Sequence, residues 1–195
     1  MTTVIFPVGH YTGVLPVAIG APNHVVRVGM KQHRLTDVEF GAWMLTHGPA
    51  EATAEPWTRR RMTAEATRLA IDLPPDLLDD LEARGLVFSI DPADPDVAGV
   101  ARGYRLEALM IGLGDTAEQP GHHRIGVPEA GVVAVLDPDS YELWQWAATT
   151  PSLWAYCELR STVTSSDDPR SAADRVFQDL RTLVAHGCGY LDVVR

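Results

Sequence analysis

An internal repeat is the feature that most constrains the fold of this chain of 195 residues. Segments 35–43 and 136–144 both carry a leucine, an aromatic residue and a tryptophan at the same spacing. Further short segments match in the same order on either side, which a chance likeness of apolar strings does not explain. Because each copy of a duplicated module must close a core of its own, we expect two domains, in residues 1–95 and 96–195.

The alignment of the two copies extends over most of their length. Downstream of the tryptophans, Leu78, Leu81 and Gly85 match Leu180, Leu183 and Gly187. Upstream, the alignment pairs residues 13–20 with 107–114, His24 with His122, and residues 27–29 with 124–126.

Each copy is expected to contain strands, then helices, then a closing strand. In the first copy we expect a hairpin over 11–29 with its turn at 20–23, and helices that begin at Thr36 or Asp37, at Thr58 and at Pro74. A strand over 86–90 and an acidic linker over 91–96 follow. The second copy repeats the plan, with strands at 104–113, 122–126, 131–136 and 189–194 and helices from Asp137, Pro151 and Ser171. This order predicts an α+β fold of two tandem winged-helix-like domains, each a β-hairpin plus three helices and a closing strand.

The charge balance disfavours nucleic acid as a partner. Sixteen basic and 26 acidic side chains give a net charge of −10, and a negative field repels a polyanion. The expected third helix of the first copy is itself acidic, so it is a poor candidate for a DNA groove. A tandem winged-helix DNA-binding regulator is kept as the alternative. Its candidate residues are Arg59, Arg60, Arg61, Arg170, Arg175 and Arg181.

Nothing in the chain indicates an enzyme, a cofactor or a metal site. It has no metal-binding histidine pair at helical spacing, no phosphate-binding glycine loop and no nucleophile elbow. Cys188 lies two residues from His186, but a neighbouring histidine alone does not make a reactive thiol. The sequence also lacks a secretory signal and a membrane-spanning run. We therefore expect a non-enzymatic protein of the cytoplasm, with no membrane partner.

The order of hairpin, helices and terminal strand, carried by residues 35–43 and 76–87, resembles the small winged-helix domains related to PqqD. The resemblance implies a non-catalytic domain that presents a peptide to a modifying enzyme. In that mode the peptide adds as a strand beside the hairpin and rests on the third helix. The corresponding positions in this chain are His24, Val26, Val28, Leu77, Leu78 and Leu81.

The leading hypothesis is thus an adaptor that binds a peptide or protein through strand edges and third-helix grooves. An adaptor predicts an unpaired strand edge beside an apolar groove. A DNA-binding regulator predicts instead a continuous positive face that joins Arg170, Arg175 and Arg181. An uncharacterised enzyme is a third hypothesis and requires a closed pocket around a titratable pair. A homodimer through the domain faces is compatible with each of them.

Overall fold

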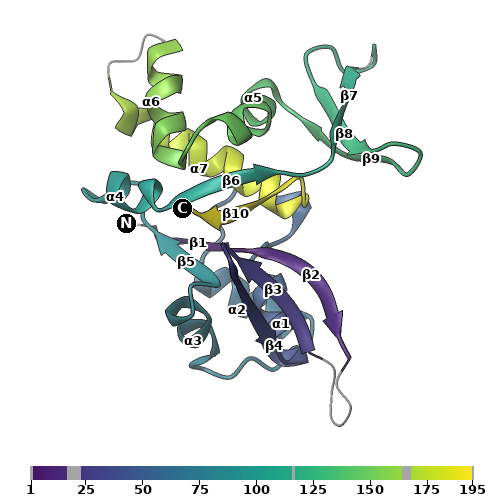
Figure 1. The fold of residues 1–195 in the computed structure, drawn as a ribbon, viewed down its shortest axis with the longest axis vertical. Coiled ribbons are helices and arrows are strands. Elements are labelled where there is room, and N and C mark those ends of the chain that lie inside the picture. The colour runs from purple at the N-terminus through teal and green to yellow at the C-terminus, as the bar shows by residue number, and fades with distance from the viewer. Residues whose placement is uncertain (1, 17–22, 116, 164–167, 195) are drawn as a thin grey trace.

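The computed structural model describes residues 2–16, 23–115, 117–163 and 168–194. It is an α+β fold with several small sheets (Figure 1). In the first half of the chain, the described residues form five strands and three α-helices. These are β1 (Val4–Pro7), β2 (His10–Leu15), β3 (Asn23–Val28), β4 (Lys31–Leu35), α1 (Asp37–Leu45), α2 (Arg59–Arg68), α3 (Leu77–Ala83) and β5 (Val87–Ile90), with a 3-10 turn η1 (Ala50–Ala52) after α1.

The second half repeats this order after one additional helix, α4 (Val97–Arg102), which directly follows the expected linker. Its elements are β6 (Tyr104–Ala108), β7 (Ile111–Asp115), β8 (His123–Val127), β9 (Gly131–Leu136), α5 (Pro138–Trp146), α6 (Leu153–Val163), α7 (Pro169–Ala185) and β10 (Gly189–Val193), with a 3-10 turn η2 (Ala147–Thr149) after α5. No helix in the described part of the chain is long and apolar enough to cross a membrane.

Two kinds of sheet build each half. β1 pairs with β5, and β6 pairs with β10, both antiparallel. The strands β2-β3-β4 and β7-β8-β9 form two three-stranded sheets. The two strand pairs meet at mid-height in Figure 1, where a parallel bridge joins Val8 to Leu191 and the Gly9 amide donates to the Leu191 carbonyl at 2.7 Å. The closing strand of the second half, β10, therefore also connects the two halves.

The repeated tryptophans occupy equivalent places. Trp43 Nε1 donates to the carbonyls of Val8 (3.2 Å) and Leu86 (3.1 Å), and Trp144 Nε1 donates to the carbonyl of Leu109 (2.9 Å). Val8 and Leu109 directly follow β1 and β6, the strands that pair with the closing strands, and Leu86 directly precedes the closing strand β5. Each indole thus ties the first α-helix of its half to that strand pair.

The structure corrects the upstream alignment of the copies. His24 stacks on Phe40 with ring centroids 4.0 Å apart, and His123, not His122, stacks on Tyr141 at the same distance. His24 pairs with Leu35 across the sheet, as His123 does with Leu136. The β-bulges of the two sheets also match: Gly13 of β2 pairs with Val25, and Gly114 of β7 pairs with Arg124. Gly13 therefore corresponds to Gly114, so the predicted alignment of residues 13–20 with 107–114 is wrong. Residues 17–22, which include most of the expected hairpin turn, lie outside the described residues.

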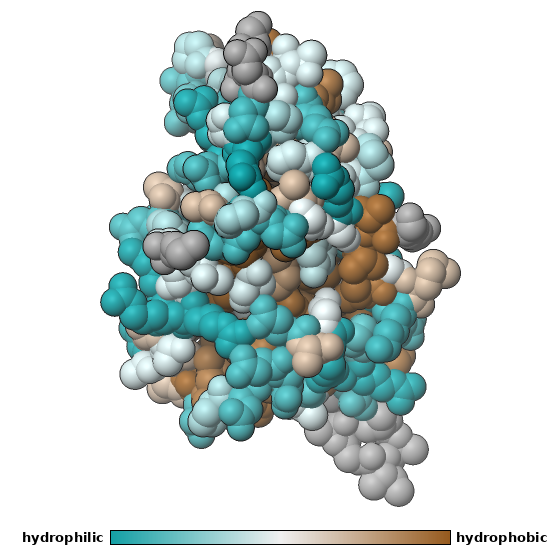
Figure 2. Space-filling view, turned by 90° about the vertical axis from the view of Figure 1, so that its left-hand side faces the viewer, coloured by the Kyte–Doolittle hydropathy of each residue, from teal (hydrophilic) through white to brown (hydrophobic). Residues whose placement is uncertain are grey.

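A single apolar core runs through both halves. Phe6 of β1 stacks on Phe88 of β5 at 5.3 Å and also contacts Phe177 of α7 at 5.9 Å. On the face shown in Figure 2, apolar residues gather at mid-height, with hydrophilic residues above and below. Because one core joins both halves, the boundary between residues 95 and 96 stays a prediction.

A buried carboxylate strengthens the joint between the halves. Asp192 of β10 accepts a hydrogen bond from the Gly29 amide at 2.6 Å and one from Arg27 Nη1 at 3.1 Å. Arg27 also donates to the Tyr190 hydroxyl at 2.8 Å. The turn between β3 and β4 is thereby fixed to the closing strand of the second half.

Replacing Asp192 with alanine is expected to lower the free energy of unfolding by about 2 kcal/mol, because the buried Gly29 N–H loses its acceptor. Asp192→Asn keeps one carbonyl oxygen for that amide and is expected to lose less. Urea unfolding followed by circular dichroism measures both values, with the exposed Asp72→Asn as control. Equal stability of Asp192→Ala and Asp72→Asn would contradict this role.

Candidate binding surfaces

The predicted peptide-binding residues do not form a free strand edge. β3, which carries His24, Val26 and Val28, is the central strand of its sheet and is paired with both β2 and β4. The two valines are buried, and the His24 ring is bonded to the side chains of Tyr11 and Asp37. The prediction that a peptide adds as a strand along residues 24–28 is therefore wrong, because β3 is paired on both sides and has no free backbone edge.

The predicted positions on the third helix are also largely covered. Leu81 of α3 is fully buried, and Leu77 and Leu78 are partly buried against the core. Their side chains belong to the packing of α3 on its own half. They line neither the pocket beside β1 and α7 nor the one beside β2 and β3.

Two of the three arginines at the start of α2 are paired with carboxylates. Arg59 bonds to Asp79 and Glu82 of α3, and Arg61 pairs with Glu55. Arg60 is exposed. The cluster thus serves mainly to join α2 to neighbouring acidic segments.

The second arginine group does not form a continuous positive face. Arg175 is exposed and Arg170 donates to the Pro95 carbonyl, but Arg181 is buried with 4% of its surface accessible. Its helix, α7, packs against α5, α6, β1 and β10. A helix enclosed in this way cannot enter a DNA groove, so the expectation that Arg181 lies on an exposed face is wrong.

The cysteines do not provide an activated nucleophile. Burial raises the pKa of Cys188 to about 11 and that of Cys157 to about 12, which keeps both thiols protonated near neutral pH. The contact of Cys188 with His186 runs through the histidine's backbone carbonyl, 4.0 Å from Sγ. Within the described ranges, no group of three or more His, Cys, Asp or Glu is arranged to hold a metal ion.

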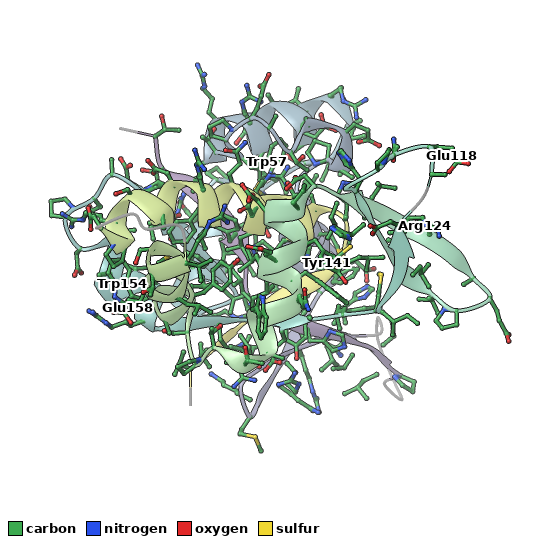
Figure 3. All side chains as sticks on the ribbon, turned by 90° about the horizontal axis from the view of Figure 1, so that it is seen from above. Trp57, Glu118, Arg124, Tyr141, Trp154 and Glu158 are labelled. Carbon is green, nitrogen blue, oxygen red and sulfur yellow. The ribbon has the colours of Figure 1, made fainter. Side chains whose placement is uncertain are left out.

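A free apolar strand edge does exist in the second half, along β9. The sheet β7-β8-β9 projects away from the body of the molecule, as the positions of Glu118 and Arg124 in Figure 3 show (compare Figure 1). β9 is an outer strand and pairs only with β8 among the described strands. Its exposed residues are Val132, Val133 and Val135, with 48%, 44% and 43% of their surface accessible.

The other side chains of β9 hold the strand in place. Ala134 and Leu136 are buried, together with Ile125 of β8. Next to them, Tyr141 of α5 stacks on His123 and on Trp144. The sheet is therefore anchored on one face, while the valines of β9 remain accessible.

The equivalent strand of the first half has a different composition. Across each sheet, Arg34 of β4 pairs with Val25, and Val135 of β9 pairs with Arg124 at the corresponding position. In the same way, Gln32 corresponds to Val132. Charged side chains on an outer strand discourage pairing with another chain, and an apolar outer strand without them favours it. The two copies have thus diverged at this strand: β9 presents apolar side chains where β4 carries polar and charged ones.

The comparisons with known proteins identify no relative. No family model, curated protein or solved structure matches the chain. The evidence on function therefore comes from the geometry of these surfaces. The run of valines in β9 was visible in the sequence, but it gives no indication of whether the strand is central or outer.

Proposed function

We propose that this protein is a non-enzymatic adaptor, built from two winged-helix-like modules, that binds an extended peptide segment of a partner protein along β9. The observation that carries the proposal is the apolar, one-sidedly paired edge of β9. An added strand gains main-chain hydrogen bonds from such an edge, and alternate side chains supply specificity. The resemblance to PqqD-like domains favours strand addition as the mode, and the exposed edge of β9 favours the second copy as the location.

The charge of the chain favours one kind of partner. With a net charge of −10, the protein attracts basic segments and steers their approach. Two copies of the chain repel each other by the same charge. The proposed ligand is therefore an extended peptide with alternating apolar residues and basic flanks, and not a second copy of this chain.

Giving β9 the residues of β4, by Val132→Gln with Val135→Arg, is expected to weaken peptide binding about tenfold or more, equivalent to about 1.4 kcal/mol. The probes are synthetic peptides selected on the wild-type protein from a phage-displayed random library, measured by fluorescence anisotropy. Because both valines are exposed, the thermal unfolding midpoint should change little.

The matched control is Val14→Gln with Leu15→Arg, which introduces the same two residues in place of apolar side chains at exposed positions of β2. It is expected to leave peptide affinity unchanged. Equal loss in both variants, loss in neither, or a library that yields no binding peptide would contradict the proposal. A wild-type dimer that becomes monomeric in the β9 variant, measured by sedimentation, would assign the edge to a second copy instead.

A further inference from the structure

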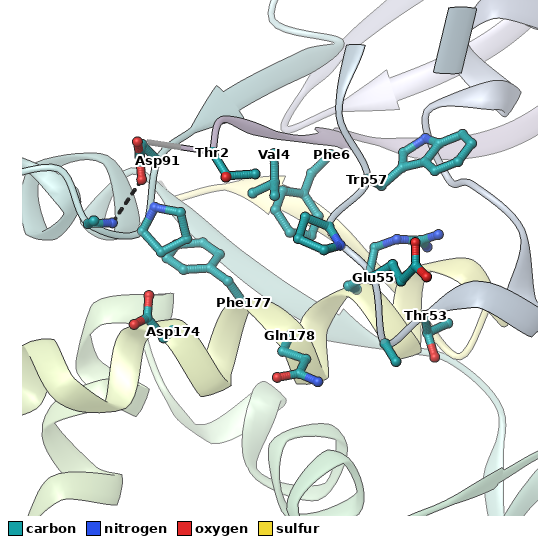
Figure 4. A pocket seen from close by; sticks show the side chains of 15 residues that line it. Thr2, Val4, Phe6, Thr53, Glu55, Trp57, Asp91, Asp174, Phe177 and Gln178 are labelled. Atoms are coloured by element: carbon teal, nitrogen blue, oxygen red, sulfur yellow. Dashed lines mark hydrogen bonds between the residues drawn. The ribbon is translucent and has the colours of Figure 1, made fainter. Parts of the chain in front are cut away.

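A pocket of about 350 Å³ lies between the two halves, away from β9. This volume is at the lower end of the range for small-molecule sites. Its walls come from β1, from segments 53–57 and 91–93, and from one face of α7 (Figure 4). The middle of the pocket is apolar, with Phe6 and Phe177 among its lining residues.

Arg181 brings an uncompensated positive charge to this pocket. Its Nη1 donates to the carbonyl of His47 at 2.5 Å and its Nη2 to that of Pro49 at 3.2 Å, while its Nε has no hydrogen-bond partner. Arg181 forms no ion pair with any described residue. Glu55 also lines the pocket, but its carboxylate pairs with Arg61. Burial lowers the pKa of Arg181 to about 10, so the guanidinium stays charged at neutral pH.

The local backbone is shaped around this arginine. Gly48 has a φ of +65°, and a Cβ at this position would lie 2.3 Å from Arg181 Nη2 and 2.8 Å from the Trp57 ring. The guanidinium carbon lies 5.5 Å from the centre of the same ring. Arg181 is therefore held in one place by carbonyls, an aromatic ring and a glycine, and no carboxylate of the described residues forms an ion pair with it.

The opposite end of the pocket is acidic. Figure 4 shows Asp91 and Asp174 at one end and Trp57 at the other, with Phe177 between them. Asp174 is exposed and makes no ion pair within the described ranges. Asp174 and Arg181 are seven residues apart on one face of α7, and a rise of 1.5 Å per residue separates their positions by about 10 Å along the axis.

We propose that this pocket binds a short unblocked peptide of two or three residues. Its carboxylate meets Arg181 through a charge-assisted hydrogen bond, its apolar side chain lies between Phe6 and Phe177, and its ammonium group meets Asp174 and Asp91. An extended chain of three residues spans about 10 Å, which fits the separation of the charged ends. A simple anion would meet repulsion from the aspartates, and a neutral apolar ligand would leave the buried guanidinium without a counterion.

Calorimetric titration with three probes tests the proposal: the unblocked tripeptide Ala-Phe-Ala, its C-terminal amide and its N-acetyl form. The unblocked peptide is expected to bind, and each blocked form to bind about tenfold more weakly or less. Asp174→Asn is expected to weaken the unblocked peptide by a similar factor. In this variant N-acetylation should cost less than in the wild type, because Asp174 no longer pairs with the ammonium group and Asp91 alone still faces it.

The matched control is Asp72→Asn, an exposed aspartate outside the pocket, which should bind like the wild type. Arg181→Gln should remove the difference between the free acid and the amide. Should that variant fail to fold, the Asp174 comparison remains a complete test. Equal affinity for all three probes, no binding of the unblocked peptide, or identical behaviour of Asp174→Asn and Asp72→Asn would overturn the proposal. The β9 variant should keep tripeptide binding, which separates this test from that of the adaptor function.

Discussion

Replacing Asp179 with alanine is expected to lower the free energy of unfolding by about 3–5 kcal/mol, the cost of leaving a buried charge without its main partner. Arg160 of α6 has 6% of its surface accessible and donates from Nη1 to Asp179 of α7 at 2.9 Å. Its Nη2 lies 2.8 Å from a carboxylate oxygen of Asp139, which is half exposed. Without Asp179, the guanidinium keeps Asp139 as a carboxylate partner, and the solvent exposure of Asp139 weakens that pair.

The matched control is Asp139→Ala, which removes the exposed partner of the same arginine. Its expected cost is at most about 1 kcal/mol, because exposed ion pairs contribute little. Replacing both members of the buried pair, Arg160→Met with Asp179→Leu, should recover most of the stability, since the cost arises from a buried charge that has lost its buried carboxylate and not from the missing contact. Urea unfolding at neutral pH measures all three variants. Equal losses in Asp179→Ala and Asp139→Ala would contradict the assignment.

Local features of this fold could be predicted from the sequence because their determinants are neighbours in the chain. Thr36 caps α1 in a reciprocal capping box with Glu39, and Thr58 caps α2 by accepting from the Arg61 amide. Gly85 and Gly187, which end the third helices, both adopt a positive φ, at 72° and 66°. In each case one or two adjacent residues set the backbone conformation.

Features that depend on distant parts of the chain could not be predicted in this way. β1 pairs with β5 across most of the first half, and no local pattern in Val4–Pro7 indicates its partner. Arg181 lies in a helix whose spacing of polar residues indicates a solvated face, but the first half of the molecule covers that position. The candidate sites could not be predicted for the same reason, because the exposure of β9 and the pocket at Arg181 both depend on how distant parts of the chain are arranged.

The structure also predicts that the stability of the protein depends on pH through the protonation of His47. Burial, with a smaller contribution from the nearby Arg181, lowers the pKa of this histidine to about 4, although Nδ1 donates to the carbonyls of Trp43 and Met44 at 3.3 and 3.2 Å. In the unfolded chain a histidine titrates near pH 6.5. Between these two values the unfolded state binds a proton that the folded state excludes, so the folded state loses stability as the pH falls from about 6.5 towards 4.

Between pH 7.5 and pH 4.5, this one group is expected to remove about 2.5 kcal/mol from the free energy of unfolding. The variant His47→Gln isolates the contribution, because its amide can donate to the same helix-end carbonyls and does not titrate. The wild type should therefore lose about 2.5 kcal/mol more than the variant over this interval, measured by urea unfolding at both pH values. Other groups titrate equally in both proteins and cancel in the comparison. Parallel pH profiles would mean that His47 is protonated in the folded state at pH 4.5, and that the guanidinium of Arg181 does not oppose a second positive charge at this helix end.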